Sequence, residues 1–287
     1  MLASPRLAVR YAVLFAAALA AGGTVQGRPA IAQGKLEARY TASLAGIPLG
    51  KGTWVIDIGD THYTATANWA TTGLLKMFSS GQGSGAARGV LAAGQPVASN
   101  YAATVKLDKK TDEVRILVNG GVVKEFHVNP PVNDDPERLP VTDALRRGVM
   151  DPMTASLLRT PGSENPMGPQ ACQRTLSIFD GRMRYDLQMA FKRMDKVRAD
   201  KGYKGPVLVC AVYFSPIAGF NPGRAAIKYL VELREIEAWL APVAGTRVLV
   251  PYRVQVPTPI GLAVLEATQF VTAAQPSRPA AAATKTQ

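Results

Sequence analysis

Histidine is scarce in this chain of 287 residues, and its scarcity argues against several kinds of site. The two histidines, His62 and His127, occupy what reads as the solvent face of predicted strands, and neither is near a second cluster of metal ligands. We therefore expect no zinc site. A Ser-His-Asp triad needs no fixed spacing, but the G-x-S-x-G elbow of many hydrolases is missing. The sequence predicts no catalytic residue, no metal and no cofactor, and hence a protein that is not an enzyme.

Glycine-rich loops that would cradle a phosphate are missing as well. The three glycines within residues 81–85 lie between two strand-like segments, whereas a dinucleotide site needs its glycines between a strand and a helix. Residues 50–53, Gly-Lys-Gly-Thr, lack the order and the upstream glycine of a P-loop. We expect no nucleotide to bind.

No apolar run in the chain is long enough to span a bilayer. The run at residues 11–21 is short of the roughly 20 residues that a membrane-spanning helix needs. It follows Arg6 and Arg10 and precedes Ala30-Ile31-Ala32, which is the pattern of a secretory signal peptide. No cysteine lies just after the apolar core, so we expect no lipid-modified N-terminus. We expect residues 1–32 to be a cleaved signal peptide that exports the chain to the periplasm; an uncleaved membrane anchor is the alternative.

The chain has only two cysteines, Cys172 and Cys210, in what read as neighbouring strands. In an oxidising compartment such a pair is most simply a disulfide. A redox-active pair is the alternative, but it usually has Cys-x-x-Cys spacing, which this chain lacks. We predict a structural disulfide.

Acidic residues are outnumbered by basic ones. The net charge is +12, and removal of residues 1–32 takes away three arginines and no acid, which leaves +9. Anionic lipid head groups are a plausible electrostatic partner for an exported basic protein. A nucleic acid would suit the charge too, but no helix-turn-helix, zinc or RNA-binding signature is present. We expect no nucleic-acid partner, and an ordinary solvated basic surface is the alternative to lipid binding.

Period-two alternation of apolar and polar residues dominates the rest of the chain. It predicts short strands separated by turns, which favours an antiparallel meander. The predicted strands cover residues 36–44, 53–58, 63–69, 101–107, 114–118, 122–128, 235–240, 247–256 and 262–271. Pro251 suggests an edge strand or a bulge. Residues 225–232 are ambiguous between helix and strand.

The predicted helical insertion lies at about 142–160. Thr142 is a candidate cap for one short helix, and Asp151 for a second helix that begins at Pro152. The predicted fold class is mainly β: a strongly curved antiparallel sheet, as a partly open barrel or spiral, with this short insertion. We expect residues 33–272 to form a single β-rich domain and residues 273–287 a disordered tail.

Asp180-Gly181 separates two alternating segments and predicts a hairpin with a type I′ turn. Several motifs together resemble the bacterial family catalogued as domain of unknown function 3108, over residues 36–272. They are Asp180-Gly181-Arg182 followed by Met183-Arg184-Tyr185-Asp186-Leu187, Asp151-Pro152 before a short helix, Cys210 followed by Ile217-Ala218-Gly219-Phe220, the segment 236–242, Pro251, and Pro259-Ile260-Gly261.

The resemblance implies an exported cell-envelope protein rich in antiparallel β structure, and it implies no reaction. Asp180, Gly181, Arg182 and Tyr185 are its candidate motif residues. For Asp180, Arg182 and Asp186, turn formation and a surface ion pair are the ordinary roles, and recognition of a partner is the functional alternative.

An apolar groove is predicted on the concave face of the sheet. Inward apolar residues recur on successive strands with only a short helical segment to cover them: Leu36, Tyr40, Trp54, Ile56, Tyr63 and Trp69. Leu74, Leu75, Met77 and Phe78 are candidates for its lip, with Gly81 to Gly85 as a hinge. Ordinary core packing is the alternative for these four residues.

The leading hypothesis is a non-enzymatic periplasmic protein of the cell envelope that binds a lipid-like ligand, a lipoprotein or another envelope protein. The predicted architecture is similar to the curved-sheet proteins that carry or sense lipoproteins. A structural interaction module with a filled core is the alternative, and an enzyme acting on envelope components is a third reading. The sequence indicates no oligomeric state.

Overall fold

The computed structural model describes residues 33–73, 80–162 and 165–276. All of them belong to one compact unit, residues 31–287. Within these described ranges no helix is long and apolar enough to cross a membrane. The predicted signal peptide and the lip residues Leu74, Leu75, Met77 and Phe78 lie outside the described residues.

The first seven strands form the predicted antiparallel meander, in which each strand pairs with the next. They are β1 (Gln33–Leu44), β2 (Ile47–Ile58), β3 (His62–Thr71), β4 (Gly81–Ala92), β5 (Gln95–Leu107), β6 (Lys110–Asn119) and β7 (Val122–Asn129). The predicted alternation is observed: Leu36 and Tyr40 are buried, whereas Glu37 and Arg39 between them are exposed.

The remaining strands extend the same sheet from β1 outwards. They are β8 (Leu158–Arg159), β9 (Arg174–Phe179), β10 (Arg184–Arg198), β11 (Lys201–Gly202), β12 (Lys204–Ala218), β13 (Glu237–Pro242), β14 (Val248–Thr258) and β15 (Gly261–Gln275). The order is β7-β6-β5-β4-β3-β2-β1-β15-β14-β13-β12-β10-β9, while β8 pairs with β14 and β11 pairs in parallel with β15. The fold is therefore mainly β, a large antiparallel sheet that does not close into a barrel, as predicted.

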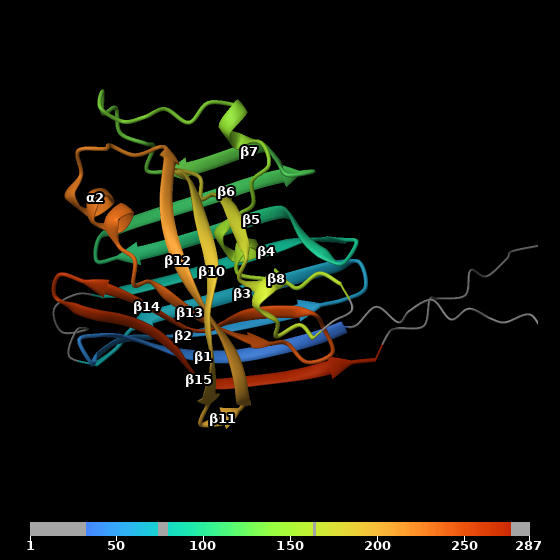
Figure 1. The fold of residues 1–287 in the computed structure, drawn as a ribbon. Coiled ribbons are helices and arrows are strands. Elements are labelled where there is room, and N and C mark those ends of the chain that lie inside the picture. The colour runs from blue at the N-terminus through green and yellow to red at the C-terminus, as the bar shows by residue number, and fades with distance from the viewer. Residues whose placement is uncertain (1–32, 74–79, 163–164, 277–287) are drawn as a thin grey trace, which may run out of the picture. The chain divides into compact units, whose positions relative to one another are not determined.

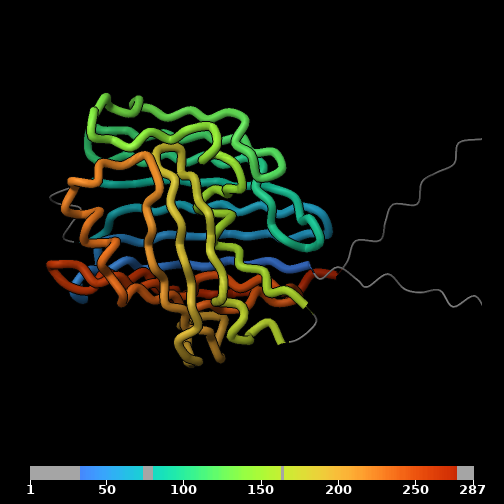
Figure 2. The backbone as a smooth tube through the Cα atoms, turned by 45° about the horizontal axis from the view of Figure 1, so that its top comes forward, coloured from blue at the N-terminus to red at the C-terminus, as the bar shows by residue number. Residues whose placement is uncertain are grey.

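The second half of the sheet folds back across the first. In Figures 1 and 2, β9, β10 and β12 cross the meander strands at a steep angle. Leu36, Ile56 and Tyr63 of the meander share one buried core with Val207 and Phe270. The inner face of the meander is thus covered largely by its own sheet, which corrects the expectation that only a short helical segment covers it.

Both faces of β12 are buried in its middle part. Val207 and Val209 belong to the core against the meander, and Leu208 and Cys210 belong to a second core on the other side. A strand that is covered on both faces is apolar at every position, since neither set of alternate side chains meets water. This explains the unbroken apolar run of residues 207–212.

The insertion between β7 and β9 holds short helices, as predicted. They are η2 (Ala144–Arg146), α1 (Pro152–Ala155) and η3 (Pro169–Ala171), and a later helix is α2 (Ala225–Glu232), which resolves the ambiguous segment as helix. Asp151 caps α1, because its side chain accepts hydrogen bonds from the backbone N–H groups of Met153 and Thr154. The predicted cap at Thr142 is wrong: Asp143 precedes η2 and makes no side-chain cap.

Three further expectations are corrected, and one of the two alternatives for Pro251 is confirmed. Gly81 to Gly85 are no hinge but the start of strand β4. Residues 273–275 belong to β15 and not to the tail. Of the two alternatives for Pro251, the bulge is confirmed, between β13 and β14, and the edge strand is excluded because β14 lies in the interior of the sheet. The turn at Asp180-Gly181 is not type I′, because Gly181 has a positive φ of 95° and Asp180 does not.

Candidate functional site

An apolar cavity of about 490 Å³ lies on the inner face of the meander. The lining comes from the neighbouring strands β14, β15, β1, β2 and β3, from Tyr101 of β5, and from the α1 region. The lining residues are Tyr40, Ala42, Gly50, Lys51, Gly52, Thr53, Trp54, Ala67, Asn68, Trp69, Tyr101, Pro152, Met153, Ser156, Pro251, Val254 and Leu265. Its volume is in the range of ordinary small-molecule sites, about 300–1,000 Å³.

Small residues on paired strands leave the space for this cavity. Gly50 lies opposite Ala42 of β1, and Gly52 lies opposite Tyr40. Because residues 50 and 52 have no side chains, the inner face of β2 is bare here, whereas Ile56 further along the strand is fully buried. The predicted groove therefore occupies only one part of the concave face, and packed core residues fill the rest of that face.

Glycines on β4 make room for the large side chains around the cavity. A Cβ added at Gly83 would lie 2.1 Å from Nε1 of Trp69, so the indole rests directly on that glycine. A Cβ at Gly85 would lie 3.1 Å from Cε of Met153. The glycine-rich segment of β4 is therefore a packing surface for Trp69 and for the lid helix α1.

Helix α1 covers the cavity and is anchored by buried polar groups. The Thr154 hydroxyl donates to Oδ2 of Asp151 at 2.5 Å and lies 2.6 Å from the Tyr63 hydroxyl. All three residues are 1% exposed. Burial raises the pKa of the Asp151 carboxyl above its ordinary value, against the opposing effect of the hydrogen bonds that it accepts. Burial also raises the pKa of Tyr63. This network holds the lid against β3.

Few polar groups interrupt the apolar lining. The Tyr40 hydroxyl donates to the carbonyl oxygen of Pro251 at 2.7 Å, which ties β1 to β14. Burial raises the pKa of Tyr101 to about 12, so its hydroxyl stays protonated near neutral pH. Lys51 and Asn68 are exposed and supply polar side chains at the solvent side of the lining. The arrangement suits the burial of an apolar chain, and among the described lining residues it presents no paired acid and base.

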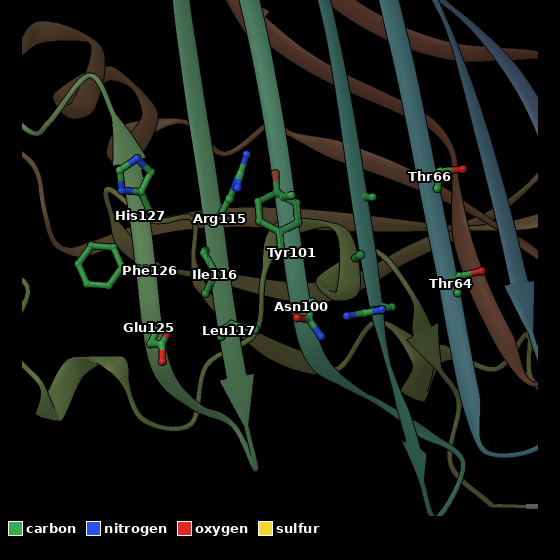
Figure 3. A pocket seen from close by; sticks show the side chains of 14 residues that line it. Thr64, Thr66, Asn100, Tyr101, Arg115, Ile116, Leu117, Glu125, Phe126 and His127 are labelled. Carbon is green, nitrogen blue, oxygen red and sulfur yellow. The ribbon is translucent and has the colours of Figure 1, made fainter.

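A second hollow, of about 650 Å³, lies on the outer face of β3–β7 (Figure 3). Figure 3 shows Arg115 and His127 on neighbouring strands, and the two residues pair in register. Arg88, Arg115, Glu125 and His127 are all exposed, as expected for His127. The lining of this hollow is mixed in charge, so it suits an apolar ligand less well than the inner cavity does.

The predicted disulfide is confirmed. Cys172 and Cys210 are bonded, with their Cα atoms 5.5 Å apart. Cys210 lies in β12, but Cys172 lies at the end of η3 just before β9, so the bond ties a loop rather than a strand to β12. In the described part of the chain no free cysteine is present.

The four family-motif residues lie together at the β9–β10 turn and do not line the apolar cavity. Oδ1 of Asp180 accepts from the backbone N–H groups of Arg182 and Met183 at 2.8 and 2.7 Å. A Cβ at Gly181 would lie 2.6 Å from a Val114 methyl, so only glycine fits against β6. Tyr185 packs against an aromatic ring of β12, with centroids 5.5 Å apart.

Sequence reasoning found the cap at Asp151 and expected the helical insertion to cover the sheet, but it did not identify several of the residues that line the cavity. Met153 and Tyr101, which line the cavity, were not identified, because their segments approach the meander only in the folded chain. Gly50 and Gly52 were considered as part of a phosphate-binding loop, and their place beside a cavity was not predicted. Two inward glycines on one strand opposite a small residue were the available signal for a cavity.

One family model and two solved structures are similar to this chain. The family described as protein of unknown function, DUF3108, matches residues 39–268. A β-barrel-like protein of domain of unknown function 1849 from Brucella abortus is similar in structure, with a TM-score of 0.46, 10% identity, and 85% of this chain and 98% of that chain covered.

A second solved structure, provisionally described as a lipoprotein, comes from Parabacteroides distasonis. It has a TM-score of 0.31 and 9% identity over 83% of this chain and 95% of that one. No curated protein matches this sequence. Because the family match spans most of the chain, this protein belongs to the DUF3108 family of proteins of unknown function.

Proposed function

We propose that this chain is an exported, non-enzymatic binding protein of the cell envelope. It holds the apolar part of a lipid-like ligand between the meander and helix α1. The observation that carries the proposal is the cavity of about 490 Å³ that Gly50, Gly52, Ala42 and Ala67 leave on an otherwise filled inner face. An apolar chain in this space would exchange water for contacts with Trp54, Trp69 and Leu265.

Export is supported by two independent features. The first is the signal-peptide pattern of residues 1–32. The second is the buried Cys172–Cys210 disulfide, because disulfides persist in oxidising compartments and are rare in the cytosol. Cell fractionation of the native organism tests this part separately, and recovery of the chain from the cytosol would contradict it.

A binding measurement with a fluorescent fatty acid tests the ligand class. Ala67→Leu places a larger apolar side chain in the cavity and should weaken binding of the probe about tenfold or more. The matched control is Ala86→Leu, which makes the same change at an exposed position on the outer face of β4 and should leave binding unchanged. Circular dichroism checks that both variants fold.

One observation favours a second candidate function, a structural interaction module. Leu36, Ile56 and Tyr63 are fully packed, so most of the inner face has no room for a ligand. If the unmodified chain binds no acyl probe at all, this alternative stands. Equal binding by the Ala67→Leu and Ala86→Leu variants would place the ligand elsewhere on the chain.

A further inference from the structure

A separate pocket of about 660 Å³ lies at the turn of the family-motif hairpin. It is built by the start of β6, the loop after β7, the turn between β9 and β10, and the residue before α2. It shares no lining residue with the apolar cavity. Three arginines from distant parts of the chain line it: Arg138, Arg182 and Arg224.

Arg182 is held in place by one of its nitrogens. Nη2 donates to Oδ1 of Asp112 at 3.1 Å and to the carbonyl oxygen of Pro130 at 3.0 Å. A guanidinium has five N–H donors, and both bonds use the same nitrogen. The N–H groups on Nε and Nη1 therefore have no acceptor among the described residues and are available to a ligand.

The other two arginines have few protein partners. Arg138 donates from Nη2 to the backbone carbonyl of Arg182 at 2.8 Å, and it forms no ion pair within the described ranges. Arg224 is exposed and makes no side-chain hydrogen bond or ion pair with any described residue. Burial lowers the pKa of Arg138, and the positive charges of Arg224 and Arg182 lower it further. Arg138 is thus close enough to both Arg182 and Arg224 to be repelled by each of them.

Positive charge exceeds negative charge in the pocket lining. Among the lining residues, Lys110 and the three arginines outnumber the two acids Asp112 and Asp135, and the nearby Asp180 adds one further negative charge that acts on Arg138. Asp112 is paired with Arg182, while Asp135 accepts from the Glu137 backbone and from Nδ2 of Asn221. Positive charge is therefore in excess in a concave site, which is the condition for attracting an anion.

We propose that this pocket binds a phosphate group, held by Arg138, Arg182 and Arg224. A tetrahedral phosphate offers enough oxygens for three guanidinium groups, whereas a carboxylate offers two. The partner that Arg182 recognises would then be an anion. The turn formed by Asp180 and Gly181 positions this arginine. The phosphate comes from a soluble anion or from a phospholipid head group.

Titration calorimetry of the purified chain with inorganic phosphate tests the site. Arg224→Gln should weaken phosphate binding about tenfold, as expected for loss of charged hydrogen bonds, and should not affect folding because the Arg224 side chain makes no hydrogen bond or ion pair with a described residue. The control is Arg198→Gln, which removes the same charge from an exposed arginine of β10 that does not line the pocket. Equal phosphate affinities of the two variants would overturn the proposal. So would an unmodified chain that binds neither inorganic phosphate here nor phospholipid vesicles in the experiment below.

Vesicle flotation separates the two sources of phosphate. Binding to phosphatidylglycerol vesicles that falls with Arg224→Gln but not with Arg198→Gln supports a head group as the ligand. Binding of inorganic phosphate with the same dependence, and no flotation, supports a soluble anion. Flotation that falls equally in both variants reflects net charge alone and counts against the site.

Discussion

The phenolic oxygen of Tyr63 lies 2.6 Å from Oγ1 of Thr154, which joins β3 to helix α1 across a separation of 91 residues. Since the Thr154 hydroxyl donates its single proton to Asp151, it accepts the proton of Tyr63. The chain Tyr63–Thr154–Asp151 is buried from end to end, so each bond is made in a medium where an unpaired partner is costly. This network fixes the lid of the apolar cavity.

Two substitutions in the network should differ in their cost. Tyr63→Phe removes one hydrogen bond and leaves Thr154 with Asp151 as its partner, so the free energy of unfolding should fall by about 1 kcal/mol. Thr154→Val leaves both the Tyr63 hydroxyl and Oδ2 of Asp151 unpaired in a buried site, and the loss should be about 2–4 kcal/mol. Urea unfolding of the two variants measures this. A larger loss for Tyr63→Phe would show that the network is not arranged as described.

Asp151 should make stability depend on pH in a direction set by its raised pKa. In the unfolded chain its pKa is about 3.9, so the folded state binds the proton more tightly. The stabilisation by this proton is fully present below the unfolded pKa and is lost as pH rises through the folded pKa. Asp151→Asn keeps an oxygen that caps α1 but does not titrate.

The difference in unfolding free energy between the unmodified chain and the Asp151→Asn variant should therefore shrink as pH rises above about 4. Urea unfolding at a series of pH values gives this difference directly, because all other titrating groups cancel. A difference that grows with pH would mean that the folded pKa is lowered.

Loss of the disulfide should destabilise the chain strongly. The bond closes a loop with a sequence separation of 38, for which chain entropy predicts about 4 kcal/mol. Thermal unfolding of Cys172→Ser should show a correspondingly lower midpoint. Addition of a reductant should lower the midpoint of the unmodified chain and leave that of the variant unchanged. If the reductant lowered the midpoint of the unmodified chain and of Cys172→Ser equally, the reductant would be acting on something other than this disulfide.

Two glycines of β4 should respond differently to alanine. Gly83→Ala brings a methyl group against the rigid indole of Trp69 and should cost about 1–3 kcal/mol of stability. Gly85→Ala meets only the flexible Cε end of Met153 at 3.1 Å, so its cost should be below about 1 kcal/mol. Denaturant midpoints of the two variants test the packing of the cavity walls, and equal costs would contradict it.

Local features of the sequence predicted the local structure well. Alternation in residues 36–44 marked the buried face of β1, because side chains in a strand point to opposite faces at every step. Asp151-Pro152 predicted the capped start of α1, since both the cap and the first helical position are decided by neighbouring residues. The Cys172–Cys210 pairing followed from there being only two cysteines.

Features that depend on distant contacts could not be predicted in this way. The sequence does not show that β15 returns beside β1, or that β12 crosses the inner face of the meander and is covered on both sides. The roles of Gly83 and Gly85 depend on Trp69 and Met153, which reach them only after folding. Alternation shows which face of a strand is apolar, but not what covers that face.

Both proposed sites depend on contacts between segments that are distant in the sequence. From the sequence alone we predicted an exported, β-rich chain with one disulfide and identified the motif Asp180-Gly181-Arg182. Only the tertiary structure decided that the groove shrinks to one cavity under α1, and that Arg138 and Arg224 meet Arg182. The physical reason is that strand periodicity and caps arise from neighbours in sequence, whereas cavities and charge clusters arise where segments far apart in sequence pack together.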